Sequence, residues 1–579
     1  MRLQIPPSVS DHSLGEESLA FLQSNILRCV GNCEHALPTS KTFLPSRLID
    51  VRKASLIVVE TEALKGSRQT DTIHYATLSY CWGSPDEGSA QLKLTRESSS
   101  ELLSGFSPDA MSSVQRDAVS VSRALGIPYL WIDALCIIQG DISDWERESS
   151  QMHKIYSCSY LCISNLATES CQHSFLSSNR IQASIPYDTL SRSKKSECYG
   201  MGPAWLSSYF GLDLEEGSWS RSDFDEARWS KRAWTFQEAA MTTRTVIIAS
   251  SGIYFNCSKG LVWEYGRVLE KPASISVGNV LEDKPVRDVY KQWYLEVATQ
   301  FSGRRPTYLS DSFPALSGIA QTFALVLNDE YVAGLWKNDL INGLFWKWDG
   351  SLASSFSKLM ESFKSPYVGP TWSWVGRVEG EFGMGKVKGF GPGGYQQYPE
   401  GSSAALRVHC DVLEVQTSPA GIDKFGRLSS AELLLKARVY PLSLGCCHMP
   451  DDPDRMDNPR GPRLIDSGQF CLEPPGGNKI PFSYYLDFFP NPDVNDPDQR
   501  WKYELLLVLV GSISYESDEQ EDSDSEEMPC GLIVHQAETE GTYWRVGTFG
   551  PATTAIPETR YELELDFFEE CEMRTLKII

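Results

Sequence analysis

The sequence predicts an α/β protein built on a mostly parallel, doubly wound sheet, followed by a helical region and a β-rich region. From residue 75 to about 250, short apolar runs alternate with helical segments, which is the order expected of repeated β-α-β units. These runs are apolar throughout, as in strands that are buried on both faces of a parallel sheet. The predicted central strands are residues 75–80, 129–134, 160–166 and 245–249.

The N-terminal part of the chain is predicted to be organised in two segments. Residues 1–74 form a lead-in, in which apolar residues at helical spacing predict a helix over 16–30. The run LPSRLIDV at 44–51 then begins a strand that continues into SLIVVE at 55–60. Residues 75–250 form the α/β domain. A polar, irregular stretch at about 176–229 is predicted to be an insertion outside the core of this domain.

The rest of the chain is predicted to contain three further segments. Residues 251–379 are mainly helical in pattern and rich in Trp, and residues 380–403 are a Gly-rich linker. Residues 404–579 contain short strand-like runs with turn-rich connections, which predicts a β-rich C-terminal region. Within it, residues 516–527 contain eight acidic residues and no basic residue, a composition that predicts a disordered loop.

The overall composition is that of a globular protein with a strong excess of acidic residues. Hydrophobic residues make up 41% of the 579 residues, and the net charge is −23. Binding to nucleic acid depends on Lys and Arg, so this charge argues against a nucleic-acid partner. No apolar run approaches the roughly 18 to 20 residues of a membrane helix, and the N-terminus lacks a secretory pattern. We therefore expect no membrane span and a cytoplasmic protein.

Three blocks carry the most specific signal: YATLSYCWG at 75–83, YLWIDALCIIQGDISDWERESSQM at 129–152 and RAWTFQE at 232–238. Together, and in this order, they resemble the heterokaryon-incompatibility (HET) domain of filamentous fungi. The resemblance covers roughly residues 75–240 and extends more weakly to about 375. It implies a role in programmed cell death after recognition of non-self during hyphal fusion, with a protein activator or self-association as the expected interaction.

The HET core is also remotely similar to Toll/interleukin-receptor (TIR) domains, some of which cleave NAD with a glutamate on a helix. This second resemblance implies a TIR/flavodoxin-like sheet. It also implies NAD as a candidate substrate, with no bound cofactor.

Glu148 is the first candidate for a catalytic residue. Ser143 and Glu146 have the spacing of an S-x-x-E capping box, and Trp145, Glu148 and Met152 then share one apolar helix face. Burial raises the pKa of a carboxyl group, and a positioned carboxylate stabilises the oxocarbenium character that develops when an N-glycosidic bond breaks. The alternative is that Glu148 pairs with a nearby Arg and orients the helix.

Further candidates follow the predicted strands, where ligands bind in open parallel sheets. Asp133, the second catalytic candidate, and Gln139 flank the end of one strand, and Ser79, Trp82 and Gly83 end another. Gly83 allows close backbone approach, and Trp82 offers a flat surface for a base or nicotinamide. A turn packed by a core Trp explains the latter three residues equally well.

The third block adds Trp234, Gln237 and Glu238 as candidates for the same ligand pocket. The alternative for these residues is the start of a helix that is packed by the Trp. Arg123 and Arg232 are both candidates to pair with the acidic residues, and the sequence does not distinguish between them.

Other site motifs are weak or absent. Cys29, Cys33 and His35 have metal-like spacing without a fourth ligand nearby, so we expect no metal site there. Neither G-x-x-x-x-G-K-[ST] nor G-x-S-x-G occurs, which removes the usual sequence support for a nucleoside triphosphatase or an α/β-hydrolase. Two hypotheses remain: an effector with NAD glycohydrolase-like chemistry, and a non-catalytic interaction module. They differ in whether Glu148 lines a cleft beside Asp133 and Trp82 or is buried beside an Arg.

Overall fold

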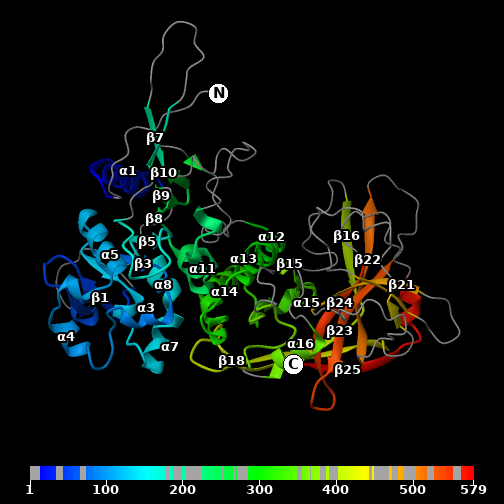
Figure 1. Ribbon diagram of the computed structural model, residues 1–579. Helices are drawn as coiled ribbons and strands as arrows, with labels where there is room; N and C mark the ends of the chain where they lie inside the picture. The colour runs from blue at the N-terminus through cyan, green and yellow to red at the C-terminus, as the bar shows by residue number, and fades with distance from the viewer. Residues whose placement is uncertain are drawn as a thin grey trace, which may run out of the picture. The chain divides into compact units, whose positions relative to one another are not determined.

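The computed structural model of the chain is shown in Figure 1. It divides into two units, Met1–Val280 and Leu281–Ile579. The structure describes residues 14–33, 43–65, 73–177, 182–186, 199–203, 223–250, 252–264, 268–269, 284–348, 355–364, 367–377, 387–389, 402–442, 446–448, 468–472, 480–487, 504–517, 527–551 and 563–579.

The first unit is built around a nine-stranded sheet whose central strands are parallel. The sheet order is β11-β10-β9-β8-β5-β3-β4-β1-β2. Its centre consists of β3 (Tyr75–Ser79), β4 (Tyr129–Trp131), β5 (Leu161–Asn165) and β8 (Thr245–Ala249), and each neighbouring pair among them is parallel. The four predicted strands are confirmed. β4 is shorter than predicted because the chain turns into α6 (Asp133–Cys136).

Antiparallel strands extend this parallel centre at both edges. On one side β4 pairs with β1, and β1 pairs with β2. The prediction of one strand continuing from 44–51 into 55–60 is wrong, because the chain turns between β1 and β2 and these two strands pair with each other. On the other side β8 pairs with β9, and β10 and β11 follow. The bounds of these strands are β1 (Arg47–Asp50), β2 (Ile57–Glu60), β9 (Gly252–Cys257), β10 (Gly260–Trp263) and β11 (Val268–Leu269).

The connecting helices lie on both sides of the parallel strands. α5 (Ser113–Ala124) leads from β3 to β4, whereas α7 (Ile142–Ser150) and α8 (Met152–Ser157) lead from β4 back to β5. Because β4 and β5 lie on opposite sides of β3, the two crossovers run in opposite directions, which places their helices on opposite faces. In Figure 1, α5 lies on one side of β3 and β5, and α8 and α11 (Ala233–Met241) lie on the other.

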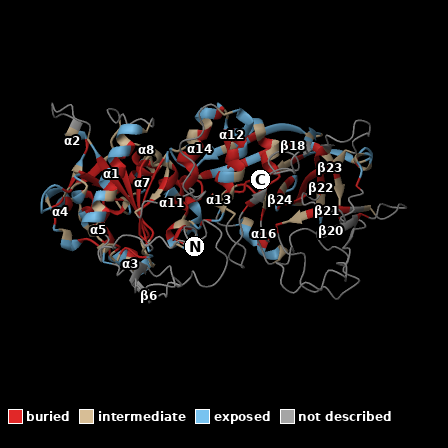
Figure 2. Cartoon of the chain, turned by 90° about the horizontal axis from the view of Figure 1, so that it is seen from above, coloured by how far each residue is buried: buried red, intermediate tan, exposed pale blue. Residues whose placement is uncertain are grey.

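The core of the first unit is the sheet with the helix faces that cover it. All residues of β3, β4, β5 and β8 are buried, and Figure 2 shows this buried centre between more exposed helices. Helix α1 (Glu16–Asn32) confirms the helix predicted in the lead-in. The remaining short helices of this unit are α2 (Glu62–Lys65), α3 (Pro85–Ala90) and α4 (Ser99–Ser104).

The capping box predicted at Ser143 is wrong. Helix α7 begins at Ile142, and the Asp141 carboxylate caps it by accepting the backbone N–H groups of Ser143 (3.1 Å) and Asp144 (3.2 Å). Asp is among the strongest N-cap residues, and its position two residues earlier shifts the helix start. The Ser143 hydroxyl donates to Asp141 at 2.9 Å instead of capping Glu146.

The second unit contains the predicted β-rich region and the part of the predicted helical region that follows Leu281. The prediction of a helical region from 251 is wrong at its start, because β9, β10 and β11 add to the sheet of the first unit. The helices of the second unit include α12 (Val286–Gln292), α14 (Pro314–Leu327) and α16 (Phe356–Lys364). Its ten-stranded sheet has the order β16-β22-β18-β25-β24-β21-β20-β19, with β17 paired to β18, and β23 paired to β22 and β24. The bounds of the shorter strands are β16 (Ser402–Val408), β17 (Asp411–Pro419), β19 (Cys446–His448), β20 (Gly468–Leu472), β21 (Ile480–Leu486), β23 (Met528–Gln536), β24 (Thr542–Phe549) and β25 (Glu572–Ile578). Its longest strands are β18 (Leu428–Pro441) and β22 (Leu505–Ser517).

Several predicted segments fall largely outside the described residues. Within the predicted insertion, β6 (Gln182–Pro186) and β7 (Tyr199–Pro203) form an antiparallel pair. Most of the predicted linker and residues 518–526 of the predicted acidic loop lie outside the described residues. Among the helices that the structure does describe, none has the length and apolar character needed to cross a membrane.

Candidate functional site

The candidate site lies at the carboxyl end of β3, where Ser79 meets Glu238 of α11. The buried Ser79 hydroxyl donates a hydrogen bond to the Glu238 carboxylate and accepts one from Trp229 Nε1 at 2.7 Å. The parallel sheet changes winding direction at β3, and such switch points place ligands beyond the carboxyl ends of the strands. The sequence-predicted residues Ser79 and Glu238 are therefore in direct contact at a favourable place in the fold.

Glu238 has a strongly perturbed carboxyl group. Glu238 is only 8% exposed. Burial raises the pKa of Glu238 to about 7, and the hydrogen bond from Ser79 and the charge of Arg232 oppose this rise only in part. Asp133 adds to the rise as a second negative charge. Near neutral pH, Glu238 is consequently poised between its protonated and ionised forms.

Asp133 lies at the end of β4 and belongs to the same group of residues. Its carboxylate accepts hydrogen bonds from Trp82 Nε1 at 2.9 Å and from the Ala134 backbone N–H at 2.7 Å. Burial raises the pKa of Asp133, and the charge of Arg232 opposes this effect. The half-buried Trp82 ring also lies 5.7 Å from the Lys93 ammonium group. Asp133 thus fixes the orientation of an aromatic ring at the carboxyl edge of the sheet.

The structure distinguishes between the two candidate arginines. Arg232 donates a hydrogen bond to the Tyr80 carbonyl, and its charge acts on both Glu238 and Asp133. Arg123 instead donates to backbone carbonyls of the 51–53 turn, with 2.7 Å to the Val51 oxygen. Arg232 is therefore the arginine that accompanies the acidic residues of the site.

Gly83 has the positive φ that its predicted role requires, but its close neighbours are side chains of the protein. Its φ is +93°, and an added Cβ would lie 2.6 Å from Glu87 Oε2 and 2.8 Å from Ser170 Oγ. The Glu87 carboxylate completes the capping box of α3 with Ser84. The close approach that Gly83 permits thus accommodates a helix cap.

The remaining predicted ligand-binding residues have packing or loop contacts. Gln139 Nε2 donates to the Asp133 carbonyl at 3.1 Å and to the Ile137 carbonyl at 3.0 Å. Trp234 packs edge to face against Trp145, with ring centroids 6.3 Å apart. Gln237 is buried in α11. Trp234 and Gln237 are on the same helix as Glu238, and Gln139 bonds to the backbone of Asp133. All three residues therefore lie near the site.

Glu148 lies in a different polar cluster, which we call the Arg47–Asp144 cluster (Arg47, Asp144, Arg147 and Glu148). Glu148 is 2% exposed, and its Oε1 is 3.6 Å from Arg147 Nε. Arg47 makes two hydrogen bonds to the Asp144 carboxylate, at 2.7 and 3.0 Å, and Arg147 pairs with the same carboxylate. Within the described part of the chain, no hydrogen bond or ion pair joins Glu148 to Asp133 or Trp82.

The two carboxylates of the Arg47–Asp144 cluster have opposite pKa shifts. Burial raises the pKa of Glu148, and a hydrogen bond from Ser46 and the charge of Arg47 offset this only in part. Burial would also raise the pKa of Asp144, but the hydrogen bonds from Arg47 and from the Ile138 backbone N–H outweigh it and lower that pKa. Asp144 is thus the ionised partner of Arg47, and Glu148 is a buried neighbour of this ion pair.

Sequence reasoning missed several residues that hold these clusters together. Trp229 fell in the predicted insertion, although it bonds to Ser79 in the core. Arg47 and Asp144 were not singled out, although their pair is buried and links β1 to α7. The LPSRLID run, which contains Arg47, was the sequence feature that could have pointed to this ion pair. His35 lies outside the described residues.

A mixed sheet with a parallel centre, and a buried Ser79–Glu238 pair at the carboxyl edge of that centre, define an α/β domain with a polar site at a switch point. The sequence had predicted a mostly parallel sheet, but the strands added at both edges are antiparallel. Residues 75–238, which contain this site, match the family model described as Heterokaryon incompatibility protein (HET). The chain therefore carries a HET domain over these residues, as the three sequence blocks predicted. No curated protein and no solved structure matches the chain significantly.

Proposed function

We propose that this chain is a cytoplasmic effector of heterokaryon incompatibility that triggers programmed cell death in a fungus after a protein activator or self-association engages it. The HET domain at residues 75–238 supports the link to heterokaryon incompatibility. We assign the activating interaction to the C-terminal unit, Leu281–Ile579, which lies outside the matched residues.

We place the chemistry of this effector at the Ser79–Glu238 pair. The observation that carries the proposal is that Glu238, with a pKa raised to about 7 by burial, lies at the carboxyl edge of the sheet beside Ser79 and Arg232. A carboxyl group with a pKa near the working pH transfers protons efficiently in both directions. Perturbed carboxyl groups of this kind are typical of functional sites. In this proposal Glu238 takes the role that the sequence had suggested for Glu148.

The proposed reaction is hydrolysis of the N-glycosidic bond of NAD, in a TIR-like manner. The bond between the ribose C1′ and the nicotinamide nitrogen breaks, and neutral nicotinamide leaves with the electron pair. Ionised Glu238 stabilises the resulting oxocarbenium character. Water then bonds to C1′ and gives its proton to the Glu238 carboxylate, which later releases it to solvent. The products are ADP-ribose, nicotinamide and a proton, and Trp82 supplies the flat surface for a ring.

A second candidate function is the non-catalytic interaction module, and a specific observation favours it. Glu148 is 2% exposed and Glu238 8% exposed, so neither carboxylate is open to a substrate in this conformation. In that case the two polar clusters would serve to hold α7 and α11 in place for an interaction surface. The catalytic proposal therefore requires that activation opens the site around Glu238.

Expression in hyphae tests the proposal and separates the two candidates. We expect wild-type protein to cause cell death together with a fall in cellular NAD, and Glu238→Gln to cause neither. Glu146→Gln, a substitution on the half-buried side of α7, is the matched control and should behave as wild type. Cell death that persists in Glu238→Gln with unchanged NAD would favour the interaction module. A wild type that never kills, even when co-expressed with incompatible partners, would contradict the effector role itself.

A further inference from the structure

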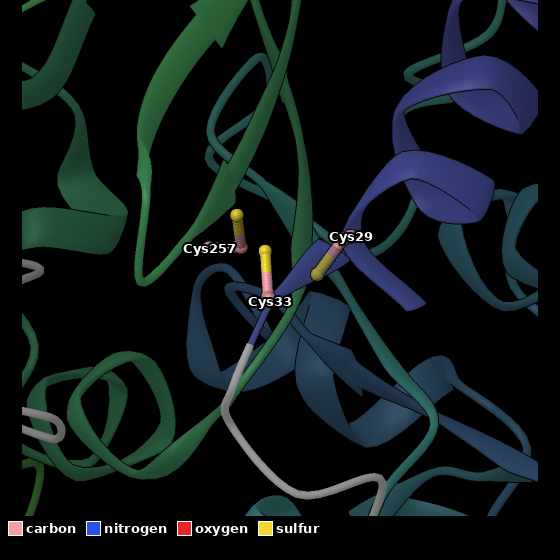
Figure 3. A group of neighbouring side chains, drawn as sticks. All are labelled: Cys29, Cys33 and Cys257. Atoms are coloured by element: carbon pink, nitrogen blue, oxygen red, sulfur yellow. The ribbon is translucent and has the colours of Figure 1, made fainter. Parts of the chain in front are cut away.

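Three cysteine thiols from distant parts of the sequence converge in the first unit. Cys29 lies in α1, Cys33 follows the end of that helix, and Cys257 is the last residue of β9. The Cys33 backbone N–H donates to the Cys29 carbonyl at 3.1 Å, so the helix geometry brings these two residues together. All three Sγ atoms lie within 4.8 Å of one another. Figure 3 shows the three side chains gathered between the end of α1 and the strand that carries Cys257.

We propose that Cys29, Cys33 and Cys257 form a site for one zinc ion, with three thiolate ligands from the protein and a water in the fourth position. Zinc prefers tetrahedral coordination by thiolates with Zn–S bonds of about 2.3 Å, which places two sulfurs on one ion about 3.8 Å apart. Sulfurs that already lie within 4.8 Å of one another need only small side-chain rotations to reach that arrangement. The site would link helix α1 to the edge of the sheet.

A buried positive charge that acts on Cys29 is the second observation that points to a bound metal-thiolate group. Arg244 is 0% exposed, and its Nη1 donates to the Tyr160 carbonyl at 3.2 Å. Its Nε and Nη2 have no hydrogen-bond partner among the described residues. A buried charge is costly without a compensating partner. Three thiolates with Zn²⁺ carry a net charge of −1, which Arg244 would neutralise.

The thiols have the chemistry and the access that a loaded site needs. The hydrogen bond with Cys257 and burial raise the pKa of Cys29, and the charge of Arg244 opposes this rise only in part. A metal ion binds cysteine as the thiolate and displaces the thiol proton on binding. Cys29 and Cys257 are buried, whereas Cys33 is half-buried and gives an ion a route to the site.

Cobalt binding to the full chain tests the proposal. The purified protein, reduced and freed of metal with a chelator, is titrated with Co²⁺ as a spectroscopic probe for zinc. We expect the near-ultraviolet thiolate-to-cobalt charge-transfer bands to appear and to disappear when Zn²⁺ is added. The triple variant Cys29→Ser, Cys33→Ser, Cys257→Ser should lose these bands. The matched control Cys158→Ser, Cys410→Ser, Cys571→Ser changes three half-buried cysteines elsewhere and should keep them.

The single variant Cys33→Ser guards against a folding failure, since it changes only the half-buried member of the cluster. We expect Cys33→Ser to keep the far-ultraviolet circular dichroism spectrum of wild type. Its charge-transfer absorption should be strongly reduced, and zinc should raise its melting temperature less than that of wild type. Bands that persist in the triple variant would overturn the proposal. A reduced, correctly folded wild type that gives no bands would also overturn it. The same holds if peptide mapping shows that two of the three cysteines re-form a disulfide instead of binding the metal.

Discussion

Ser79 at the end of β3 donates a hydrogen bond to the carboxylate of Glu238 in α11, across 159 residues of sequence. This contact joins the first and third sequence blocks of the HET domain. Trp229 donates to the same Ser79 hydroxyl at 2.7 Å, so the hydroxyl is oriented toward the carboxylate. The pair places one titratable group at the carboxyl edge of the parallel strands and makes its protonation state the central property of the site.

The first prediction concerns the titration of Glu238. Burial raises its pKa from 4.5 to about 7, so the folded state retains a proton that the unfolded state loses between these values. The stabilisation from protonated Glu238 is therefore complete below about pH 4.5 and is lost as the pH rises to about 7, a difference on the order of 3 kcal/mol. Difference infrared spectra of wild type against Glu238→Gln should show the carboxylic-acid carbonyl band fading through about pH 7.

The matching stability measurement compares the two proteins at about pH 5 and pH 8. Glu238→Gln cannot ionise, so its free energy of unfolding should fall less than that of wild type over this interval. Glu238 would have an ordinary pKa if the carbonyl band is already gone near pH 5 and the unfolding free energies of the two proteins depend equally on pH.

The second prediction separates the two carboxylates of the Arg47–Asp144 cluster. Asp144→Ala leaves the buried Arg47 without its carboxylate partner and should cost about 3 to 5 kcal/mol of unfolding free energy. Glu148→Gln should cost little, because Arg47 and Arg147 keep Asp144 as their partner and burial already disfavours the ionised form of Glu148. Urea unfolding checks both values. Equal losses of unfolding free energy in the two variants would contradict this prediction, because Glu148 would then stabilise the fold as much as Asp144 does.

The third prediction concerns the turn after β3. Gly83→Ala combines a φ of +93° with a Cβ only 2.6 Å from Glu87 Oε2, so it should destabilise the protein by more than about 1 kcal/mol. Gly126→Ala is the matched control, since Gly126 also has a positive φ, +71°, but open space within 4 Å of the added Cβ. Melting curves should show a larger loss for Gly83→Ala. A similar loss for both would mean that backbone strain alone matters at Gly83.

The sequence predicted the centre of the fold well because its signal is local. The apolar runs at β3, β4, β5 and β8 are buried on both faces, so each strand is visible in its own residues. The start of α7 was predicted two residues late. Two potential caps, Asp141 and Ser143, lie close together there, and local pattern does not rank them.

The site was predictable only in part because its contacts are distant in sequence. Ser79 and Glu238 were each candidates, but their contact depends on how α11 packs against the end of β3. Glu148 was correctly placed on a buried helix face. Its neighbours Arg47 and Asp144 come together only when β1 adds to the sheet beside β4. Likewise, Cys29 and Cys33 showed weak metal-like spacing, but Cys257, the third member of the cluster, lies at the end of β9, far along the chain.

The most direct test of the central claim is nicotinamide release from NAD by the purified full-length protein, measured for wild type, Glu238→Gln and Glu148→Gln in the presence of an activating cell extract. We predict turnover by wild type, a loss of at least about 100-fold in Glu238→Gln, as expected for removal of a proton-transferring group, and retained turnover in Glu148→Gln. All three proteins should show comparable melting temperatures. Undiminished turnover by a folded Glu238→Gln, or a wild type that leaves NAD intact under every activating condition, would contradict the proposal that Glu238 is the catalytic carboxylate of this HET domain.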